Sequence, residues 1–296
     1  MPEAIQNTTQ SVWGLSVIVY LFLAGVGAGA YLTSWWNTRN GGMGTLAVVG
    51  RYLAAPLVAI GTLLLVFDLG AGRMHLGRIF GLFTHPISMM SLGTWILTLF
   101  LIASVIDGYG PLVRVHRVAW LGTVTAVLAV AVAIYTGVLL GVVKAIPLWN
   151  TALLPVLFVL SACSTGMAAV FFCSLLAGRR NLGDVESFGG LHIAVVLTEI
   201  AVLGLLLFIA ANGSSAARYS YMLIVDGRFA AMFWYGLVVV GLGLPIVYAL
   251  LSRTRPLIRY LQSPSWIMLE SILVLVGGFF LRYLVVSAGA VARILG

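Results

Sequence analysis

The sequence predicts an all-α, polytopic membrane protein with eight transmembrane helices. Of its 296 residues, 61% are hydrophobic and only 8% are charged, against about 45–50% and about 25% in soluble domains. Apolar runs recur along the whole chain, and each has roughly the 20 residues needed to cross a hydrocarbon core of about 30 Å. The basic residues are scattered in ones to threes. This pattern excludes an ordinary soluble fold, a disordered chain and a nucleic-acid-binding surface.

Eight apolar runs follow one another in a single integral membrane domain of residues 1–296. Helices are expected because the bilayer core offers no water to backbone groups. The first run lacks a basic leader and an A-x-A cleavage site, so we expect a retained helix and not a removed signal peptide. Short polar segments such as Asn37–Gly42, Arg179–Glu186 and Ser252–Arg259 separate the runs. The predicted helices span about 12–34, 47–68, 86–106, 118–140, 151–176, 190–211, 229–250 and 266–288.

The basic residues indicate an orientation. With the N-terminus outside, nine of them lie at the inner ends and loops and seven on the outer side, which favours both termini on the outer, periplasmic side of a prokaryotic inner membrane. The inner nine are Arg39, Arg51, Arg114, Arg117, Arg179, Arg180, Arg253, Arg255 and Arg259, and the outer seven are Arg73, Arg78, Lys144, Arg218, Arg228, Arg282 and Arg293.

Two stretches of small residues resemble each other. They are Phe22-Leu-Ala-Gly-Val-Gly-Ala-Gly-Ala-Tyr31 in the first run and Phe158-Val-Leu-Ser-Ala-Cys-Ser-Thr-Gly-Met-Ala-Ala-Val170 in the fifth. Either the chain holds an internal repeat of two four-helix bundles, or the small residues serve close helix packing alone, which is the more common reason for such runs.

Polar side chains inside the apolar runs are the candidates for function, because a carboxylate at mid-helix costs roughly 2.5–3.5 kcal/mol on insertion scales. Glu199 lies near the middle of the sixth run. It is either a proton-path residue in a cavity wall, or a structural acid that is protonated or paired with an arginine. Asp68 ends the second run, and Tyr20 and Tyr135 lie deeper than interfacial aromatic residues. For these three, purely local structural roles stay open.

Tyr20, Tyr135 and Asp68 are expected at a similar depth. The first run descends from the outer face and places Tyr20 roughly 12 Å below it. The fourth run ascends and places Tyr135 roughly 8 Å from the same face, while the second run ends there with Asp68. Three polar groups from three helices therefore converge, which independent structural residues need not do.

The sequence predicts no haem, iron–sulfur cluster or other metal in this chain. A membrane cytochrome needs histidines that face each other across helices. Here His75, His85 and His116 fall in or beside loops, and His192 opens the sixth run. With two cysteines, the chain has no cluster motif. A redox role would need the metal centres of a partner chain.

A series of motifs, spread in order from the first run to the eighth, carries a family resemblance. They are Trp13-Gly14 with Tyr20-Leu-Phe-Leu-Ala-Gly-Val-Gly-Ala-Gly29, Phe67-Asp-Leu-Gly-Ala-Gly-Arg73, His85-Pro-Ile-Ser-Met-Met-Ser-Leu-Gly-Thr-Trp95, Tyr135-Thr-Gly-Val-Leu-Leu-Gly141, Pro147-Leu-Trp-Asn-Thr-Ala-Leu-Leu-Pro155, Phe158-Val-Leu-Ser161 with Thr165-Gly166, and Gly277-Gly-Phe-Phe-Leu-Arg-Tyr283. Taken together, they resemble the NrfD-type family, the membrane subunits of polysulfide reductase and related molybdenum–iron–sulfur oxidoreductases.

The resemblance implies eight helices in two four-helix bundles, both termini outside, and a pocket for menaquinone or ubiquinone near the outer side. Tyr135 matches the family's quinone-site tyrosine. Tyr20 stands where polysulfide reductase has a quinone-binding histidine, and Val17 where it has an asparagine. Asp68 matches an acid beside the quinol pocket. Because tyrosine is a poor proton acceptor at neutral pH, Asp68 becomes the candidate acceptor of quinol protons.

The resemblance also implies partners. These are an iron–sulfur subunit of the four-cluster ferredoxin type, docked on the outer face, and a molybdopterin catalytic subunit that would choose the terminal substrate. Arg73, His75 and Arg78 directly follow Asp68 and are candidates for docking the iron–sulfur subunit, with lipid-headgroup contact as the alternative. The protein would then pass electrons between this partner and the membrane quinone pool.

Two other functions stay open. A secondary transporter would use Glu199 and the Gly-rich helices, whereas a passive anchor would have no quinone site and its polar residues would satisfy one another. A proton path through Glu199 and His192 toward the inner face is a further hypothesis.

Overall fold

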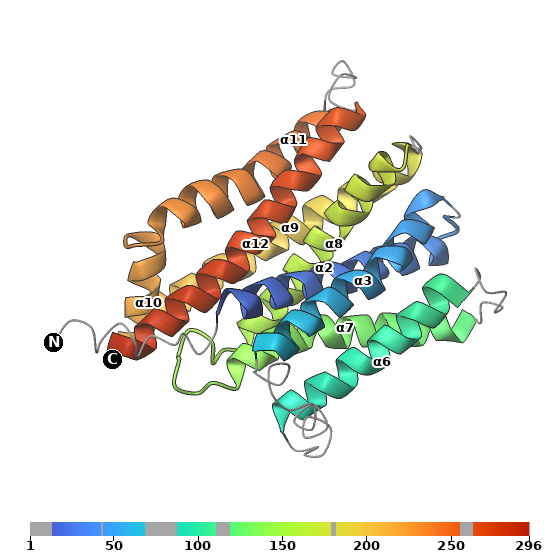
Figure 1. The fold of residues 1–296 in the computed structure, drawn as a ribbon. Coiled ribbons are helices and arrows are strands. Elements are labelled where there is room, and N and C mark those ends of the chain that lie inside the picture. Colours follow the sequence, from blue (N-terminus) through green and yellow to red (C-terminus); the bar gives the residue numbers. More distant parts are fainter. Residues whose placement is uncertain are drawn as a thin grey trace.

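The computed structural model describes residues 14–42, 44–68, 88–110, 119–178, 182–254 and 263–295. Within these ranges eight helical spans are long and apolar enough to cross a membrane, which confirms the predicted all-α fold and its eight spans (Figure 1). The elements are α2 Leu15–Arg39, α3 Thr45–Asp68, α6 Met89–Tyr109, α7 Ala119–Gly141, α8 Leu153–Leu176, α9 Leu182–Ala211, α10 Ser215–Val225, η2 Met232–Gly243, α11 Leu244–Thr254 and α12 Pro264–Leu295.

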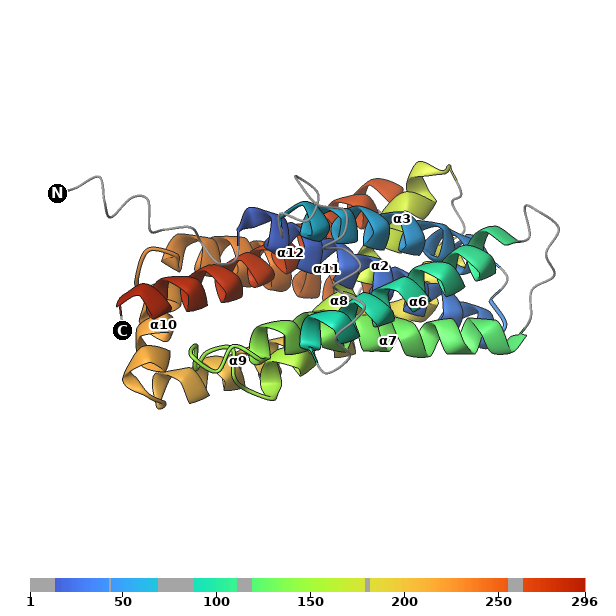
Figure 2. The ribbon, with the colours of Figure 1, turned by 60° about the horizontal axis from the view of Figure 1, so that its bottom comes forward.

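Two elements differ from the predicted pattern. The predicted loop between the sixth and seventh runs contains α10, an 11-residue helix that lies across one end of the bundle (Figure 2). The seventh run is not a uniform α-helix, because its 12 residues Met232–Gly243 form the π-helix η2, which continues into the α-helix α11. Hydropathy measures how apolar a run is and does not distinguish these two helix types.

The spans alternate in direction, so that α2 begins and α12 ends at the same end of the bundle, beside α10 (Figures 1 and 2). We call this the terminal end and the other the opposite end. Helices α3, α7 and α9 end at the terminal end, and α6 and α8 begin there. Which end faces the periplasm stays a prediction, as does the division into two four-helix bundles.

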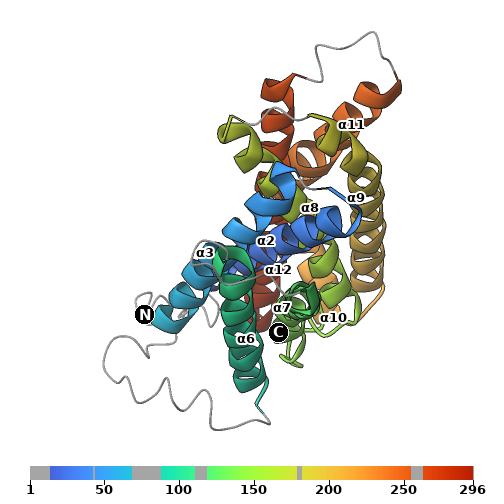
Figure 3. The ribbon, with the colours of Figure 1, turned by 90° about the vertical axis from the view of Figure 1, so that its right-hand side faces the viewer.

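Helices α2 and α8 cross at the centre of the molecule, whereas α6, α9 and α11 lie at its periphery (Figure 3). The crossing depends on small residues. A Cβ atom at Gly29 would overlap the backbone of Ala162, and one at Gly166 would overlap the backbone of Gly29 and Ala30. The two similar small-residue stretches thus pack directly on each other, which supports the close-packing interpretation of both.

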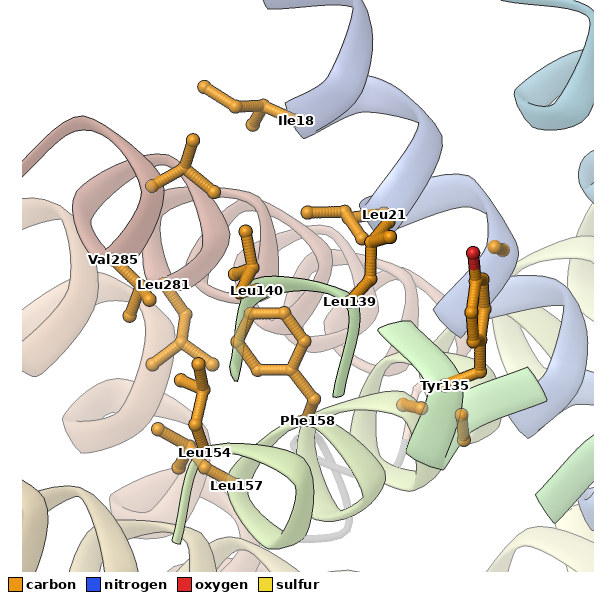
Figure 4. Packing of buried hydrophobic residues seen from close by; sticks show 14 of the residues in the cluster. Ile18, Leu21, Tyr135, Leu139, Leu140, Leu154, Leu157, Phe158, Leu281 and Val285 are labelled. Atoms are coloured by element: carbon orange, nitrogen blue, oxygen red, sulfur yellow. The ribbon is translucent and has the colours of Figure 1, made fainter. Parts of the chain in front are cut away.

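An apolar core lies beside this crossing, toward the terminal end. Leu21 of α2, Leu140 of α7, Phe158 of α8 and Leu281 of α12 are at most 1% exposed and converge from four helices (Figure 4). Between α7 and α8, the buried Trp149 donates a hydrogen bond of 2.8 Å from Nε1 to the Val285 carbonyl oxygen of α12. The core therefore fixes α2, α7, α8 and α12 relative to one another.

The α2–α8 crossing can be tested with Gly29→Ala. We expect a loss of about 3 kcal/mol, the upper part of the range for overpacking, because the clash is with backbone and no side chain can rotate away. The measurement is thermal unfolding of the purified chain in detergent.

The matched control is Gly204→Ala on α9, where an added Cβ meets no atom within 4 Å. Its Tm should be unchanged or slightly higher, because alanine favours helix over glycine. Equal Tm values for the two variants would contradict the crossing.

Candidate functional site

Tyr20 of α2 and Tyr135 of α7 come together near the terminal end, as the sequence predicts. Tyr20 is 0% exposed and Tyr135 is 5% exposed. The two phenols are close enough to interact electrostatically, and the Tyr135 side chain extends toward α2 (Figure 4). Among the residues that the structure describes, the Tyr20 hydroxyl has no hydrogen-bond partner. A buried donor without a partner costs about 1–3 kcal/mol.

Helices α3 and α6 pack against the two tyrosines. Gly93 of α6 lies directly against the Tyr135 ring, so that a Cβ atom there would overlap it. Gly61 of α3 lies against Tyr20, and a Cβ atom there would be 3.5 Å from Tyr20 Cδ2. Two residues before Gly93, the Oγ atom of the buried Ser91 also lacks a hydrogen-bond partner within the described ranges. The site thus combines apolar walls with a Tyr20 hydroxyl that has unused hydrogen-bonding capacity.

The remaining residues predicted for this site lie at the edge of the described structure. Asp68 is the last residue of α3, at the terminal end and seven positions beyond Gly61. Its backbone position agrees with the predicted convergence, while its side chain lies outside the described part. Arg73, His75 and Arg78 lie in residues 69–87, outside the described ranges.

A buried arginine occupies the centre of the molecule. Arg282 of α12 is 0% exposed, and its Nε donates a hydrogen bond of 3.1 Å to the Leu21 carbonyl oxygen of α2. Its Nη1 donates to Ser161 Oγ of α8 at 3.1 Å and to the Gly278 carbonyl oxygen at 3.0 Å. The assignment of Arg282 to the outer-side basic residues was therefore wrong, because it lies inside the span.

Aromatic rings and a glycine complete the surroundings of Arg282. Its Cζ lies 5.7 Å from the Phe22 ring centroid and 5.4 Å from that of Phe158, within the range of cation–π attraction. A Cβ atom at Gly25 would overlap Nη2. Gly25 is therefore required where the guanidinium passes α2.

Glu199 of α9 lies beside this arginine. It is 2% exposed, accepts a hydrogen bond of 2.9 Å from Ser164 Oγ, and interacts with the Ser161 hydroxyl and the Arg282 guanidinium. These partners favour the interpretation of Glu199 as a structural acid paired with an arginine. Its role in a proton path stays a prediction.

A second charged cluster joins α2, α3 and α6 near the opposite end. Asp107, 3% exposed, accepts a hydrogen bond of 2.7 Å from the Tyr31 hydroxyl. Arg51 Nε lies 3.1 Å from Asp107 Oδ2, and Arg51 Nη2 donates to Thr38 Oγ1 at 3.3 Å. The acid, the arginine and the tyrosine pair with one another across three helices, which favours a structural role for the cluster.

Reasoning from the sequence missed Arg282, although its signal was present. Arg282 interrupts the run 266–288 in the same way that Glu199 interrupts the sixth run, and an arginine at mid-helix is as costly as a carboxylate. Counting basic residues for orientation treated Arg282 as a loop residue. Pairing each charge inside a run with an opposite charge inside another run would have identified it.

The interaction between Arg282 and Glu199 can be tested with a double-mutant cycle. Arg282→Leu removes the charge that faces Glu199, and losing one partner of a buried pair costs about 3–5 kcal/mol. Arg282→Leu with Glu199→Leu removes both charges and should recover part of that loss. Thermal unfolding in detergent measures both.

The control is Arg218→Leu on α10, an exposed site where we expect a change within about 0.5 kcal/mol. Strictly additive losses in the double variant would show that the two buried charges do not interact.

Comparison of the sequence with known proteins shows the family of this chain. The chain matches the family described as "Polysulphide reductase, NrfD" over residues 3–293. It is 32% identical to the C chain of polysulfide reductase from Wolinella succinogenes, with 97% of this chain and 96% of the relative covered. It is 29% identical to protein NrfD of Escherichia coli, with 94% and 95% covered, and 26% identical to the NrfD homolog of Haemophilus influenzae, with 96% of each covered. Eight apolar spans and a match over nearly its whole length show that the protein is a multi-pass integral membrane member of the NrfD (polysulphide reductase) family.

Proposed function

We propose that the protein is the quinone-binding membrane subunit of a multi-subunit respiratory oxidoreductase, with its quinone site at Tyr20 and Tyr135. One observation carries the proposal. The buried Tyr20 hydroxyl interacts electrostatically with Tyr135 and has no hydrogen-bond partner within the described residues. A ligand oxygen would supply the missing hydrogen bond, and convergent polar groups in apolar walls are the usual form of a small-molecule site.

The chemistry of a quinone fits these groups. Oxidation of a quinol releases two electrons and two protons, so the site needs hydrogen-bond partners for two ring oxygens and an acceptor for protons. The Tyr20 and Tyr135 hydroxyls would bind ring oxygens, and the α3 and α6 walls at Gly61 and Gly93 would hold the flat ring. Asp68, at the terminal end of α3, is the proposed proton acceptor because phenols accept protons poorly at neutral pH.

The electrons would pass to or from a partner. One relative is named as the C chain of polysulfide reductase, which supports a subunit role for this protein. We propose an iron–sulfur subunit of the four-cluster ferredoxin type as the direct partner and a molybdopterin subunit as the catalytic one. Arg73, His75 and Arg78 of the 69–87 segment, which follows the quinone site, are the proposed docking residues.

The other two functions have weaker support. A passive anchor would satisfy its own polar groups, yet Tyr20 and Ser91 have no partner among the described residues. A transporter would need Glu199 available to a substrate, yet Glu199 is engaged with Ser164 and Arg282. Both observations favour the quinone site.

Tyr135→Phe tests the site in the assembled complex. We expect quinol oxidation by a menaquinol analogue to fall about tenfold, which corresponds to the loss of one hydrogen bond of about 1.4 kcal/mol in the transition state. Asp68→Asn should lower the same rate through the loss of the proton acceptor. Electron transfer and subunit assembly are measured on the same preparation.

The matched control is Tyr235→Phe, which removes the hydroxyl of a tyrosine that is 71% exposed on η2 and should change nothing. If Tyr135→Phe and Asp68→Asn both keep the full rate in assembled complexes, the quinone site is elsewhere.

Partner docking has its own test. Affinity purification of the tagged protein should recover an iron–sulfur subunit, and charge reversal by Arg73→Glu with Arg78→Glu should reduce that recovery, because these charges would then repel the surface they now attract. Lys144→Glu, in the loop between α7 and α8, is the control for a single charge reversal elsewhere on the protein. Substrate uptake by the isolated protein in liposomes, with no co-purifying subunit, would favour the transporter.

A further inference from the structure

A groove of about 300 Å³ opens between α11 and α12, toward the opposite end from Tyr20 and Tyr135. Its walls are mostly aliphatic side chains, of which Val247, Leu251 and Leu269 are 53%, 40% and 44% exposed. Because the protein spans a membrane, these exposed side chains face lipid. The volume lies at the lower end of the range for small-molecule sites.

The groove contains a polar corner. Glu270 of α12 lines it, and so does Tyr248 of α11, which is close enough to Glu270 to interact electrostatically. Behind them, His192 Nδ1 of α9 lies 3.7 Å from Glu270 Oε1, longer than a hydrogen bond. His192 is 6% exposed, and its Nε2 has no partner within the described ranges. An acid, a phenol and an imidazole therefore lie together at this corner. A groove that only contacted lipid tails would need apolar side chains alone.

The residues that line the corner and its depth in the membrane limit the chemical class of ligand that the groove can bind. The described residues that line the groove include the acid Glu270 and neither lysine nor arginine, so no cationic group of this lining would attract an anionic phosphate group. Glu270 lies six residues after Pro264, about 9 Å along α12. That is deeper than the headgroup layer, which is roughly 5–8 Å thick on each side of a bilayer. The corner suits an uncharged ring that donates or accepts hydrogen bonds within the hydrocarbon region.

We propose that this groove is a second lipid-phase ligand site, in which Glu270 and Tyr248 hydrogen bond the ring oxygens of a quinol and the aliphatic walls hold its ring and tail. The choice of a quinol rests on the proposed function, while the site itself stands on the groove and its polar corner. Two quinol sites would then lie toward opposite ends of the bundle, one between α2 and α7 and one between α11 and α12.

Binding of 2-heptyl-4-hydroxyquinoline N-oxide, a fluorescent quinol analogue, tests the proposal. Titration of the purified full-length protein in nanodiscs should give two sites per molecule. Glu270→Gln replaces the carboxyl group by an amide and should weaken one site at least tenfold. Leu269→Trp fills the groove and should abolish the same site. Its matched control is Ile272→Trp, a residue of α12 with 43% exposure that does not line the groove, and both sites should survive it.

The outcomes separate the two proposals. Tyr135→Phe should weaken only the site that survives Leu269→Trp. If Tyr135→Phe has no effect while Leu269→Trp and Glu270→Gln remove a site, the proposed function at Tyr20 and Tyr135 fails and the groove site stands. A single site that only Tyr135→Phe weakens, or two sites that Leu269→Trp and Glu270→Gln leave intact, would overturn the groove proposal.

Discussion

The buried guanidinium of Arg282 is the constraint on which the arrangement of the central helices depends. A charge at this depth costs roughly 2.5–3.5 kcal/mol on insertion scales, so each neighbouring helix must contribute a compensating group. Helix α2 gives the Leu21 carbonyl, α8 gives Ser161, and α9 gives the Glu199 charge. A shift of any of these helices by one residue would break a contact, and the charge therefore specifies their register as well as their proximity.

This constraint extends to the candidate quinone site through α2. Tyr20 immediately precedes Leu21, whose carbonyl oxygen is bound by Arg282, and the Gly29 crossing with α8 fixes the same helix two to three turns further on. Near the opposite end, the hydrogen bond from Tyr31 to Asp107 holds α2 against α6. Tyr20 is thus on a helix held at three levels, which gives the positional precision that a hydrogen-bonding site needs.

The sequence was sufficient for the eight spans and for the similar depth of Tyr20 and Tyr135, because length, hydropathy and alternating direction determine both. It does not determine which helices are neighbours, so the lateral proximity of the two tyrosines comes from the structure. It was insufficient for η2, since a π-helix and an α-helix of the same apolar residues have the same hydropathy. The short helix α10 lies below the length that a hydropathy window detects. The position of Arg282 within the run 266–288 already indicated its depth, but its partners Ser161 and Glu199 lie on other helices, and no single apolar run reveals them.

Two buried carboxylates are held by other groups of the protein. Asp107 accepts a hydrogen bond from Tyr31 and is paired with Arg51, whereas Glu199 accepts a hydrogen bond from Ser164 and interacts electrostatically with Arg282. The Tyr20 hydroxyl and the Nε2 of His192 lack partners in the described structure although both side chains are buried. Because burying an unpaired neutral donor brings no folding advantage, a hydrogen bond from a ligand to either atom would stabilise the protein. Tyr20 lies between apolar helices, and His192 lies behind a groove that is open enough for a lipid-borne ligand.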